Sequence, residues 1–314
     1  MSTRKLSRAM VLTAALIALT ACSTTAEGAP QATNGSTAQS AVNESARNLL
    51  PEDIRNDGKL VFGSTANNAP FTMKTGDTMG GMLPELGTEV GAVLGVDVQF
   101  EAMAFPGLVP ALTAKRIDGI WTLMQATEER ETTLEMISYM KNSQSFMTLA
   151  DAAPVENTEA LCSLHLSTVR GGTSQRLLDS IAEDCEKAAH GRPEISLFDD
   201  PATAQTQLRS GRVDAFAGIT VPVRYVADTV ENGSVFTVAP IEYLGGAQAI
   251  ALAKGDTDLA AALQAAFKVV IDSGRYKEIL AKYGAENETF TAEQIVLNPA
   301  TSGVLDDVVR TESK

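Results

Sequence analysis

A strand, a glycine turn and a helix follow one another in residues 164–185, which read LHLSTVRGGTSQRLLDSIAEDC. The apolar run Leu164–Val169 predicts a buried strand, and Gly171-Gly172 predicts the turn behind it. One side of the helix that follows carries Leu177, Leu178, Ile181 and Cys185. A second strand is expected at Ile195–Phe198, so this stretch predicts two parallel strands joined by a helix.

The same alternation extends along most of the chain. Further strands are expected at Lys59–Ser64, Val96–Phe100, Ile117–Leu123, Val213–Gly218 and Ala247–Ala253. Helices are expected from Leu83 to Leu94, ended by Gly95, then at Leu108–Arg116, at Ala202–Ser210 and on Leu259, Leu263, Phe267 and Val270. Strict alternation of strands and helices predicts parallel sheets covered by helices, which is the α/β class. Ligands of such sheets bind at the carboxyl ends of the strands, so the loops of interest follow Phe62, Trp121, Val169 and Phe216.

Charge and length limit the classes of function. The formal charge of −14 becomes −17 when residues 1–22, which carry three basic side chains and no acid, are left out. Nucleic-acid partners require Lys and Arg against phosphates, and no basic cluster interrupts the acidic chain. We therefore expect no nucleic-acid partner. The remaining 292 residues exceed what one hydrophobic core ordinarily serves, so two lobes are expected.

The first 22 residues have the pattern of an export signal. A basic start precedes a mostly apolar run, Ala9–Ala21, and small residues lie before Cys22. The order Leu19-Thr20-Ala21-Cys22 resembles the bacterial lipoprotein box, which implies a diacylglyceryl group on Cys22 as membrane anchor and an extracellular location. The alternative is an uncleaved membrane helix, but the apolar run is shorter than the roughly 20 residues that a bilayer crossing needs.

Residues 23–50 predict a flexible tether, because the segment up to Asn48 holds almost no large apolar side chain. A linker of this length spans about 25–30 Å root mean square. With Cys22 assigned to lipid, Cys162 and Cys185 remain, and an even pair in an exported chain favours a disulfide over a metal site. The only imidazoles belong to His165 and His190. We therefore expect no bound metal, no cofactor and no cysteine–histidine catalysis.

Two short segments predict anion sites. Arg130 lies one helical turn beyond the end of the expected strand Ile117–Leu123, where its planar guanidinium can bind a carboxylate through two hydrogen bonds. The alternative is a solvated arginine paired with Glu128 or Glu129. Gly171-Gly172-Thr173-Ser174 begins a helix, whose free N–H groups and dipole favour an anion, although a simple helix cap explains it equally well.

The chain resembles the family 3 extracellular solute-binding proteins of amino-acid ABC importers over about residues 55–285. The resemblance rests on the order of several short motifs rather than on one of them. These are Ala69-Pro70-Phe71, Gly81–Leu86, Phe105–Leu112, Arg116–Gly119, Thr127–Arg130 with Ser138-Tyr139, Gly172–Gln175, Ser210–Ala215 and Ile271–Tyr276. It implies a two-lobed, type II periplasmic-binding-protein-like fold in which each lobe is a mainly parallel sheet flanked by helices. Two hinge crossings are expected, near Phe146–Ala150 and Pro240–Gly246.

The resemblance also implies domain boundaries and site residues. Lobe 1 is expected at 51–147 and 246–284 and lobe 2 at 148–245, while the role of the tail 285–314 is open. Arg130 corresponds to the arginine that binds the ligand α-carboxylate, with Thr173 and Ser174 as donors from lobe 2. The expected ligand contacts are completed by Phe105, Gln125, Thr122 and Asn68. If Thr122 faces the cleft, its neighbour Trp121 points into the core behind it.

The sequence departs from the family pattern at three places. Ile219 occupies the position of the aspartate that pairs with the ligand ammonium, Asn67 or Asn68 replaces an aromatic residue, and Leu123 replaces a small one. A buried charge without its partner costs several kcal/mol, which is a large part of the roughly 8 kcal/mol of micromolar binding. Unless Glu85, Glu242 or backbone carbonyls substitute for it, Ile219 predicts a carboxylate ligand whose nitrogen is neutral, blocked or displaced.

The expected function is that of a membrane-tethered, monomeric binding protein without enzymatic activity, which delivers a small carboxylate to an ABC permease. One alternative is a dehydratase-like enzyme of the same fold, which needs a general acid or base within reach of its substrate. Glu242 is the only candidate acid in lobe 2, and His165 and His190 are expected away from the cleft. A sensory lipoprotein that works without a transporter is the other alternative.

Overall fold

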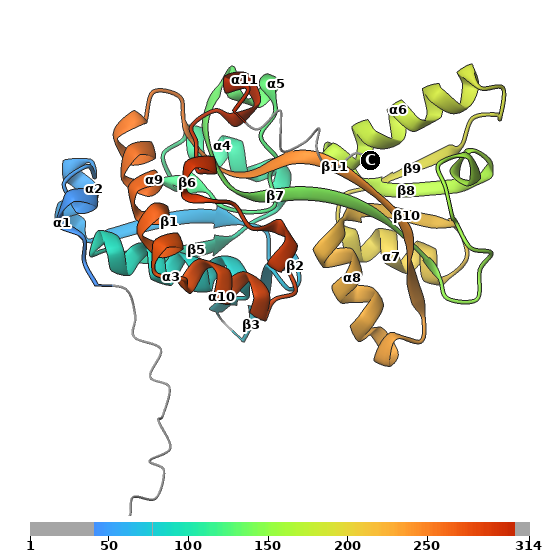
Figure 1. Ribbon diagram of the computed structural model, residues 1–314, viewed down its shortest axis with the longest axis horizontal. Coiled ribbons are helices and arrows are strands. Elements are labelled where there is room, and N and C mark those ends of the chain that lie inside the picture. Colours follow the sequence, from blue (N-terminus) through green and yellow to red (C-terminus); the bar gives the residue numbers. More distant parts are fainter. Residues whose placement is uncertain (1–40, 77, 305–314) are drawn as a thin grey trace, which may run out of the picture. The chain divides into compact units, whose positions relative to one another are not determined.

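Two long antiparallel strands, β7 (Leu134–Leu149) and β11 (Phe236–Ala253), run through both lobes of this α/β protein (Figure 1). The structure is a computed structural model, which describes residues 41–76 and 78–304. The eight strands of the main sheet have the order β5-β1-β6-β11-β7-β10-β8-β9. Strands β5, β1 and β6 belong to lobe 1, and β10, β8 and β9 belong to lobe 2.

Lobe 1 is built on β1 (Lys59–Ser64), which pairs in parallel with β5 (Asp97–Ala102) and β6 (Gly119–Ile120). Its helices are α3 (Met82–Leu94), α4 (Leu108–Thr113), α5 (Glu128–Glu131), α9 (Thr257–Asp272) and α10 (Arg275–Lys282). A small antiparallel sheet joins β2 (Asn67–Asn68), β3 (Thr72–Thr75) and β4 (Thr78–Gly80). Gly95, at φ +66°, ends α3 where the sequence predicts it.

The core of lobe 1 is organised around Trp121, which is fully buried. Its ring lies 5.3 to 5.9 Å, between centroids, from the rings of Phe62, Phe100, Tyr139 and Phe267. These aromatic side chains come from the sheet and from α9, so they fasten the helix to the strands. Trp121 thus lies in the core, although the condition on which this was expected, that Thr122 faces the cleft, is not met, since Thr122 is buried too.

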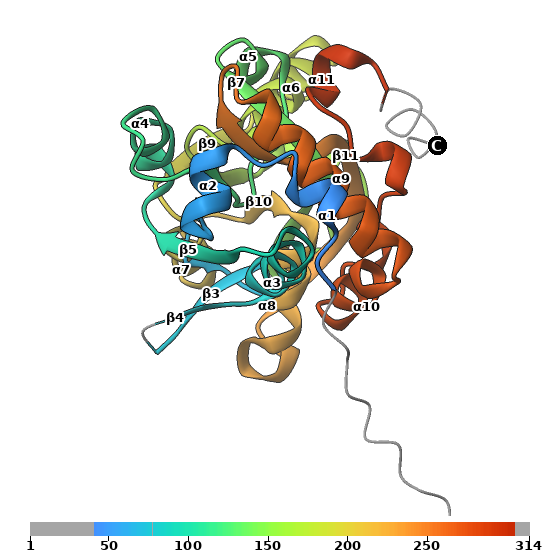
Figure 2. The same ribbon diagram turned by 90° about the vertical axis from the view of Figure 1, so that its left-hand side faces the viewer.

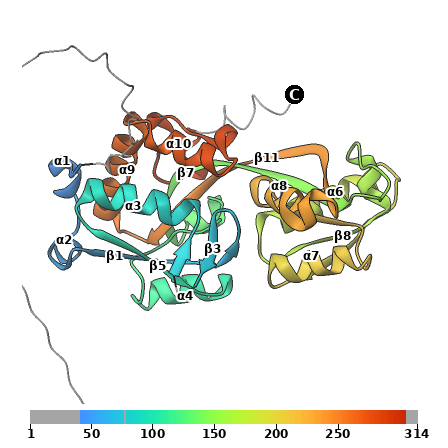
Figure 3. The same cartoon turned by 90° about the horizontal axis from the view of Figure 1, so that it is seen from below.

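Lobe 2 is a sheet of β8 (His165–Val169), β9 (Glu194–Phe198) and β10 (Ala215–Ile219) beside the far halves of β7 and β11. Helix α6 (Thr173–Lys187) covers one face, and α7 (Pro201–Arg209) and α8 (Thr220–Thr229) cover the other (Figures 1 and 3). Successive residues of β10 point to opposite faces, so Ala215 and Ala217 pack under α6 while Phe216 packs under α7 and α8.

The crossings between the lobes lie in β7 and β11. Residues 144–147 of β7 already pair with β10 of lobe 2, so the first crossing precedes the expected Phe146–Ala150 segment. The register of β11 against β7 shifts between Leu244 and Ala247, within the expected second hinge. Gly246 has φ +98°, which favours glycine at this bulge. The boundary of lobe 1 therefore lies a few residues before the expected residue 147.

One strand prediction was wrong, and one long strand was missed. The strand expected at Ile117–Leu123 forms only at Gly119–Ile120, because the chain turns away from β1 after two paired residues. The long strand β7 was not predicted as one element, because its buried positions include polar residues that mask strand periodicity. The pairs of β1, β8 and their neighbours are parallel as predicted, but β7 and β11 are antiparallel.

Both ends of the described chain pack on lobe 1. The tether expected to reach residue 50 ends earlier, since α1 (Glu44–Arg47) and α2 (Glu52–Asp57) are folded and α1 lies against α3 and α9 (Figure 2). Arg47 Nη1 donates to the Leu94 carbonyl at 2.9 Å, and Ala46 and Leu50 are buried. The signal, Cys22 and the tether up to residue 40 lie outside the described residues.

The C-terminal segment covers the edge that β7 exposes in lobe 1. Ser138 N donates to the Val296 carbonyl at 3.0 Å, and Asn298 N donates to the Met136 carbonyl at 2.6 Å. The carboxylate of Glu131 accepts two backbone N–H bonds, both of 2.8 Å, at the start of α11 (Pro299–Ser302). Residues 285–304 of the tail are thus an integral part of lobe 1.

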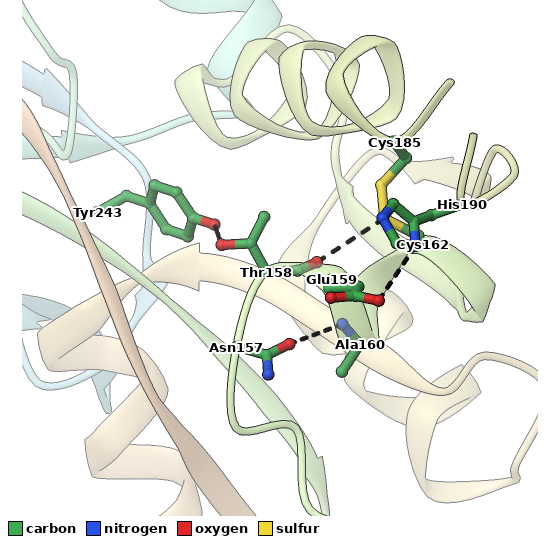
Figure 4. Close-up of a disulfide and its surroundings, with 8 residues drawn as sticks. All are labelled: Asn157, Thr158, Glu159, Ala160, Cys162, Cys185, His190 and Tyr243. Carbon is green, nitrogen blue, oxygen red and sulfur yellow. Dashed lines mark hydrogen bonds and ion pairs between the residues drawn. A yellow bond between two sulfur atoms is a disulfide. The ribbon is translucent and has the colours of Figure 1, made fainter. Parts of the chain in front are cut away.

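Cys162 and Cys185 form a disulfide, as the sequence predicts, within lobe 2 (Figure 4). The bond joins the 3₁₀ helix Glu159–Ser163 to the last turns of α6. Next to it, the Thr158 and Tyr243 hydroxyls bond at 2.5 Å, which connects this corner to β11.

In residues 41–76 and 78–304 no helix is long and apolar enough to cross a membrane. No cluster of metal-ligating side chains occurs in the same part of the chain.

Candidate ligand-binding cleft

A cavity of about 740 Å³ lies between the two lobes. Lobe 1 lines it with the loop after β1, the 3₁₀ helix Phe105–Gly107 and the segment from Leu123 to Arg130. Lobe 2 contributes the first turns of α6, α7 and α8 and the end of β10. Most of these segments follow the carboxyl ends of strands, where the sequence analysis expected the site.

Arg130 is held at the cleft by contacts to both lobes. Thr127 caps α5 by accepting from Arg130 N at 3.3 Å, which fixes the backbone behind the side chain. Arg130 Nη1 donates to the Gln125 carbonyl at 2.8 Å, and Nη2 donates to the Gly171 carbonyl of lobe 2 at 3.3 Å. The guanidinium also lies 5.9 Å from the centre of the Phe105 ring.

The Arg130 guanidinium keeps its charge and some of its N–H donors, so it is suited to bind an anion. Burial lowers the pKa of its guanidinium, a like charge on Arg176 adds to the decrease, and Glu129 opposes it. An arginine remains protonated despite such a decrease. Each Nη nitrogen carries a second N–H besides the one that binds a carbonyl, so the guanidinium retains donors for a carboxylate.

The N-terminus of α6 faces the same cavity. Gly171, at φ +73°, turns the chain out of β8, and Gly172 caps the helix without a side-chain hydrogen bond. Thr173 and Ser174 line the cavity in the first turn, where N–H groups lack helical acceptors. The helix has 15 residues, so its dipole favours negative charge at this end.

The structure brings together most of the predicted ligand contacts. The predicted ligand contacts that line the cavity are Arg130, Thr173, Ser174, Phe105, Gln125, Asn68 and Ile219. Asn67 and Leu123, at the two other departures from the family pattern, line it as well. The Gln125 side chain accepts from Asn142 Nδ2 of β7 at 2.9 Å, which connects this wall to the hinge.

Thr122 is the exception among the predicted contacts. It is fully buried and does not line the cavity, and its hydroxyl bonds that of Thr65 at 2.9 Å. Thr65 lies above it in the cavity wall and accepts from Asn68 Nδ2 at 2.6 Å. Because β6 ends at Ile120, the strand alternation that aimed Thr122 at the cleft does not reach it.

The acids considered as substitutes for an aspartate at position 219 lie elsewhere. Glu85 bonds Lys282 and Tyr283, and Glu242 pairs with Arg224 at 3.0 Å, all outside the cavity. His165 and His190 pair with Glu194 and Glu159 and also lie away from the cavity.

Sequence reasoning missed several parts of the wall, among them Lys74 and residues 102–104 of lobe 1 and two segments of lobe 2. Asp199 and Asp200 line the cavity from the loop between β9 and α7, which follows a strand end that was not among the loops of interest. Pro222, Val223 and Val226 line it from the first turns of α8, a helix that was not predicted. The rule that ligands meet strand ends could have found the first of these lobe 2 segments, since β9 lies in the same parallel set.

A two-lobed α/β protein with a cavity between its lobes, lined by Arg130 and the N-terminus of α6, is suited to binding a small molecule. The chain belongs to the bacterial extracellular solute-binding proteins, family 3, whose sequence profile it matches over residues 60–286.

Several relatives of this chain are named for the amino acids that they bind. The chain is 25% identical to the L-arginine-binding protein of Pseudomonas aeruginosa, with 72% of this chain and 88% of the relative covered. It is 27% identical to the ABC transporter glutamine-binding protein GlnH of Bacillus subtilis, with 74% and 84% covered. Among solved structures, an ancestral arginine-binding protein bound to arginine has a TM-score of 0.65 and 26% identity, with 72% of this chain and 98% of that chain covered. An ancestral precursor of cyclohexadienyl dehydratase shares the fold, with a TM-score of 0.64, 23% identity, and 74% and 97% covered.

Proposed function

We propose that this protein is the substrate-binding component of an ABC importer and captures a small carboxylate of amino-acid or amino-acid-like structure. The observation that carries the proposal is the convergence of Arg130 and the α6 N-terminus, from different lobes, on one cavity. Both supply N–H donors and positive potential, which match a carboxylate. Membership of the family and the amino-acid-binding relatives support it.

Capture proceeds by closure of the two lobes. A carboxylate bound by Arg130 of lobe 1 and by the first turn of α6 stabilises the arrangement in which these groups meet. The two strands β7 and β11 connect the lobes, and the bulge at Gly246 is a point where rotation can be absorbed. The closed, loaded protein is the form that docks on the permease.

The finer features of the proposal concern the membrane. We propose that Cys22 carries lipid and holds the protein at the extracellular face of the cell membrane. The segment between Cys22 and α1 then acts as the tether, shortened at its C-terminal end by the folded residues 43–50. The protein acts as a monomer, since one chain supplies both sides of the cleft.

Binding without chemistry is the preferred function because Glu242, the acid that the enzyme alternative requires, lies outside the cavity, and the two acids that line it already bond Arg170 and Thr203. Glu242 pairs with Arg224 outside the cavity, so it cannot reach a proton of a ligand bound at Arg130. A sensory role would use the same cleft, and the presence or absence of permease and ATPase genes beside this one distinguishes it from import.

Thermal unfolding of the mature chain with Cys22→Ser, which prevents lipidation, tests the proposal. The panel contains amino acids, hydroxy acids, betaines and simple carboxylates. A ligand at 100 times its dissociation constant adds about 2.7 kcal/mol to the free energy of unfolding. We expect a carboxylate to raise the unfolding temperature of the parent protein and not of Arg130→Ala. Equal increases in both would contradict the proposal.

A further inference from the structure

One part of the lobe 2 wall of the cavity is apolar. It is formed by Ala217, Gly218, Ile219, Pro222, Val223 and Val226, from the end of β10 and the first turns of α8. A Cβ on Gly218 would lie 2.7 Å from the Phe216 ring and 2.9 Å from Val223, so no larger side chain fits there. Leu123 and Met103 contribute apolar surface from lobe 1. The wall therefore favours an uncharged, apolar part of a ligand.

The acids that line the cavity are both engaged by protein groups. Asp199 lies 3.4 Å from Arg170 Nε. Asp200 caps α7, since it accepts from Thr203 N at 2.9 Å and from the Thr203 hydroxyl at 2.7 Å. In the part of the chain that the structure describes, no other carboxylate lines the cavity. A cationic group of a ligand thus meets only carboxylates that already bond protein groups, Asp199 in an exposed pair and Asp200 in the cap of α7.

The cations at the cavity oppose a positively charged ligand as well. Lys74, Arg130 and Arg170 line it, against the two engaged acids. A ligand cation beside Ile219 would lose its hydration to an apolar wall without gaining an opposite charge. A ligand with one negative charge and no positive charge avoids both penalties.

We infer that the ligand is an anion whose remainder is uncharged and apolar, so that its carboxylate meets Arg130 and α6 while its apolar part lies against Ile219, Pro222 and Val226. The inference rests on the proposed function and narrows it. A ligand of this kind distinguishes the protein from its arginine-binding relatives and excludes standard α-amino acids as tight ligands.

Calorimetric titration of the mature Cys22→Ser chain with four probes tests the inference. The probes are 4-methylpentanoate, N-acetyl-L-leucine, L-leucine and L-arginine. L-Leucine differs from 4-methylpentanoate only in its ammonium group, so this pair isolates the charge. We expect 4-methylpentanoate and N-acetyl-L-leucine, which carry no positive charge, to bind about 100-fold or more tightly than L-leucine or L-arginine, the size of effect that a buried charge without a partner produces.

Two variants of one residue sharpen the test. Ile219→Asp supplies a carboxylate to the apolar wall, and Ile219→Asn is its uncharged control of the same shape. We expect Ile219→Asp to gain at least about tenfold in affinity for L-leucine and Ile219→Asn to gain none. Thermal unfolding of both variants without ligand shows whether they remain folded, and Asp200→Asn tests whether the capping acid binds an ammonium.

The outcomes separate the inference from the proposed function. If L-leucine or L-arginine binds as tightly as the two probes without a positive charge and Arg130→Ala abolishes that binding, carboxylate capture stands and the inference is overturned. A loss of that amino-acid binding in Asp200→Asn would identify the ammonium partner and overturn the inference too. If none of the four probes binds, or if their binding is unchanged in Arg130→Ala, the inference and the proposed function both fail.

Discussion

Replacement of Arg130 by alanine removes the group that we place at the centre of ligand capture. The side chain lines the cavity, and each Nη nitrogen has one N–H on a backbone carbonyl and one available for a ligand. A hydrogen bond to a charged group contributes about 1.5–3 kcal/mol, so the loss of two costs about 3–6 kcal/mol. Since 1.4 kcal/mol is a factor of ten, we expect the dissociation constant to rise by about two to four orders of magnitude.

The assay is calorimetric titration with the carboxylate that raises the unfolding temperature most, applied to Arg130→Ala, Arg130→Lys and Arg176→Ala. Lysine keeps the charge but not the planar fork, so its affinity should lie between those of the parent and of the alanine variant. Arg176 pairs with Glu129 at 3.4 Å, outside the cavity, and is the matched control for loss of a nearby cation. We expect its removal to change the affinity less than about threefold, because exposed ion pairs contribute little. An Arg130→Ala protein that stays folded and binds within threefold of the parent would refute the reasoning.

Three further predictions concern stability. Burial raises the pKa of the Glu288 carboxyl, whose Oε1 accepts from the Ser143 hydroxyl at 2.7 Å, so the native state favours its protonated form. The free energy of unfolding therefore falls as the pH rises through this pKa. Glu288→Gln should unfold at a higher temperature than the parent at neutral pH, and the difference in unfolding temperature should shrink in acid. A difference that stays constant from pH 4 to 8 would contradict the assignment. Replacement of Cys162 and Cys185 by serine opens a loop with a sequence separation of 23 residues and should lower the free energy of unfolding by about 3 kcal/mol. The measurement is denaturant titration under oxidising conditions. The parent under reducing conditions should have the same free energy of unfolding as the variant. Trp121→Ala should cost about 3–5 kcal/mol and Trp121→Phe clearly less, since the ring fills the centre of lobe 1; equal losses would show that the aromatic packing is not responsible.

The sequence predicted local elements well where periodicity and a stop residue agreed. Helix α3 ends at Gly95 as expected, because glycine alone adopts φ +66° without strain. The strand at 165–169 and the turn before α6 follow from the apolar run and from Gly171-Gly172. These features depend on neighbouring residues, so the sequence contains the whole signal.

Elements that depend on distant partners were harder to predict. Strand β7 carries Asn142 and Ser143 at buried positions, and their side chains bond Gln125 and Glu288, which are distant in the sequence. Thr122 was misplaced because the end of β6 is set by pairing with β1 rather than by its own residues. The position of Arg130 near the α6 N-terminus likewise depends on the lobe arrangement, which the chain length and the two anion-binding segments suggested and the family resemblance made specific.

The central claim is that a carboxylate binds Arg130 and α6 together, and a crystal structure of the mature Cys22→Ser chain with a bound carboxylate tests it most directly. We predict that one or both carboxylate oxygens lie within about 3.2 Å of Arg130 nitrogens and of the backbone N–H groups of Thr173 or Ser174. A ligand whose carboxylate lies away from Arg130, or that contacts only one lobe, would contradict the account.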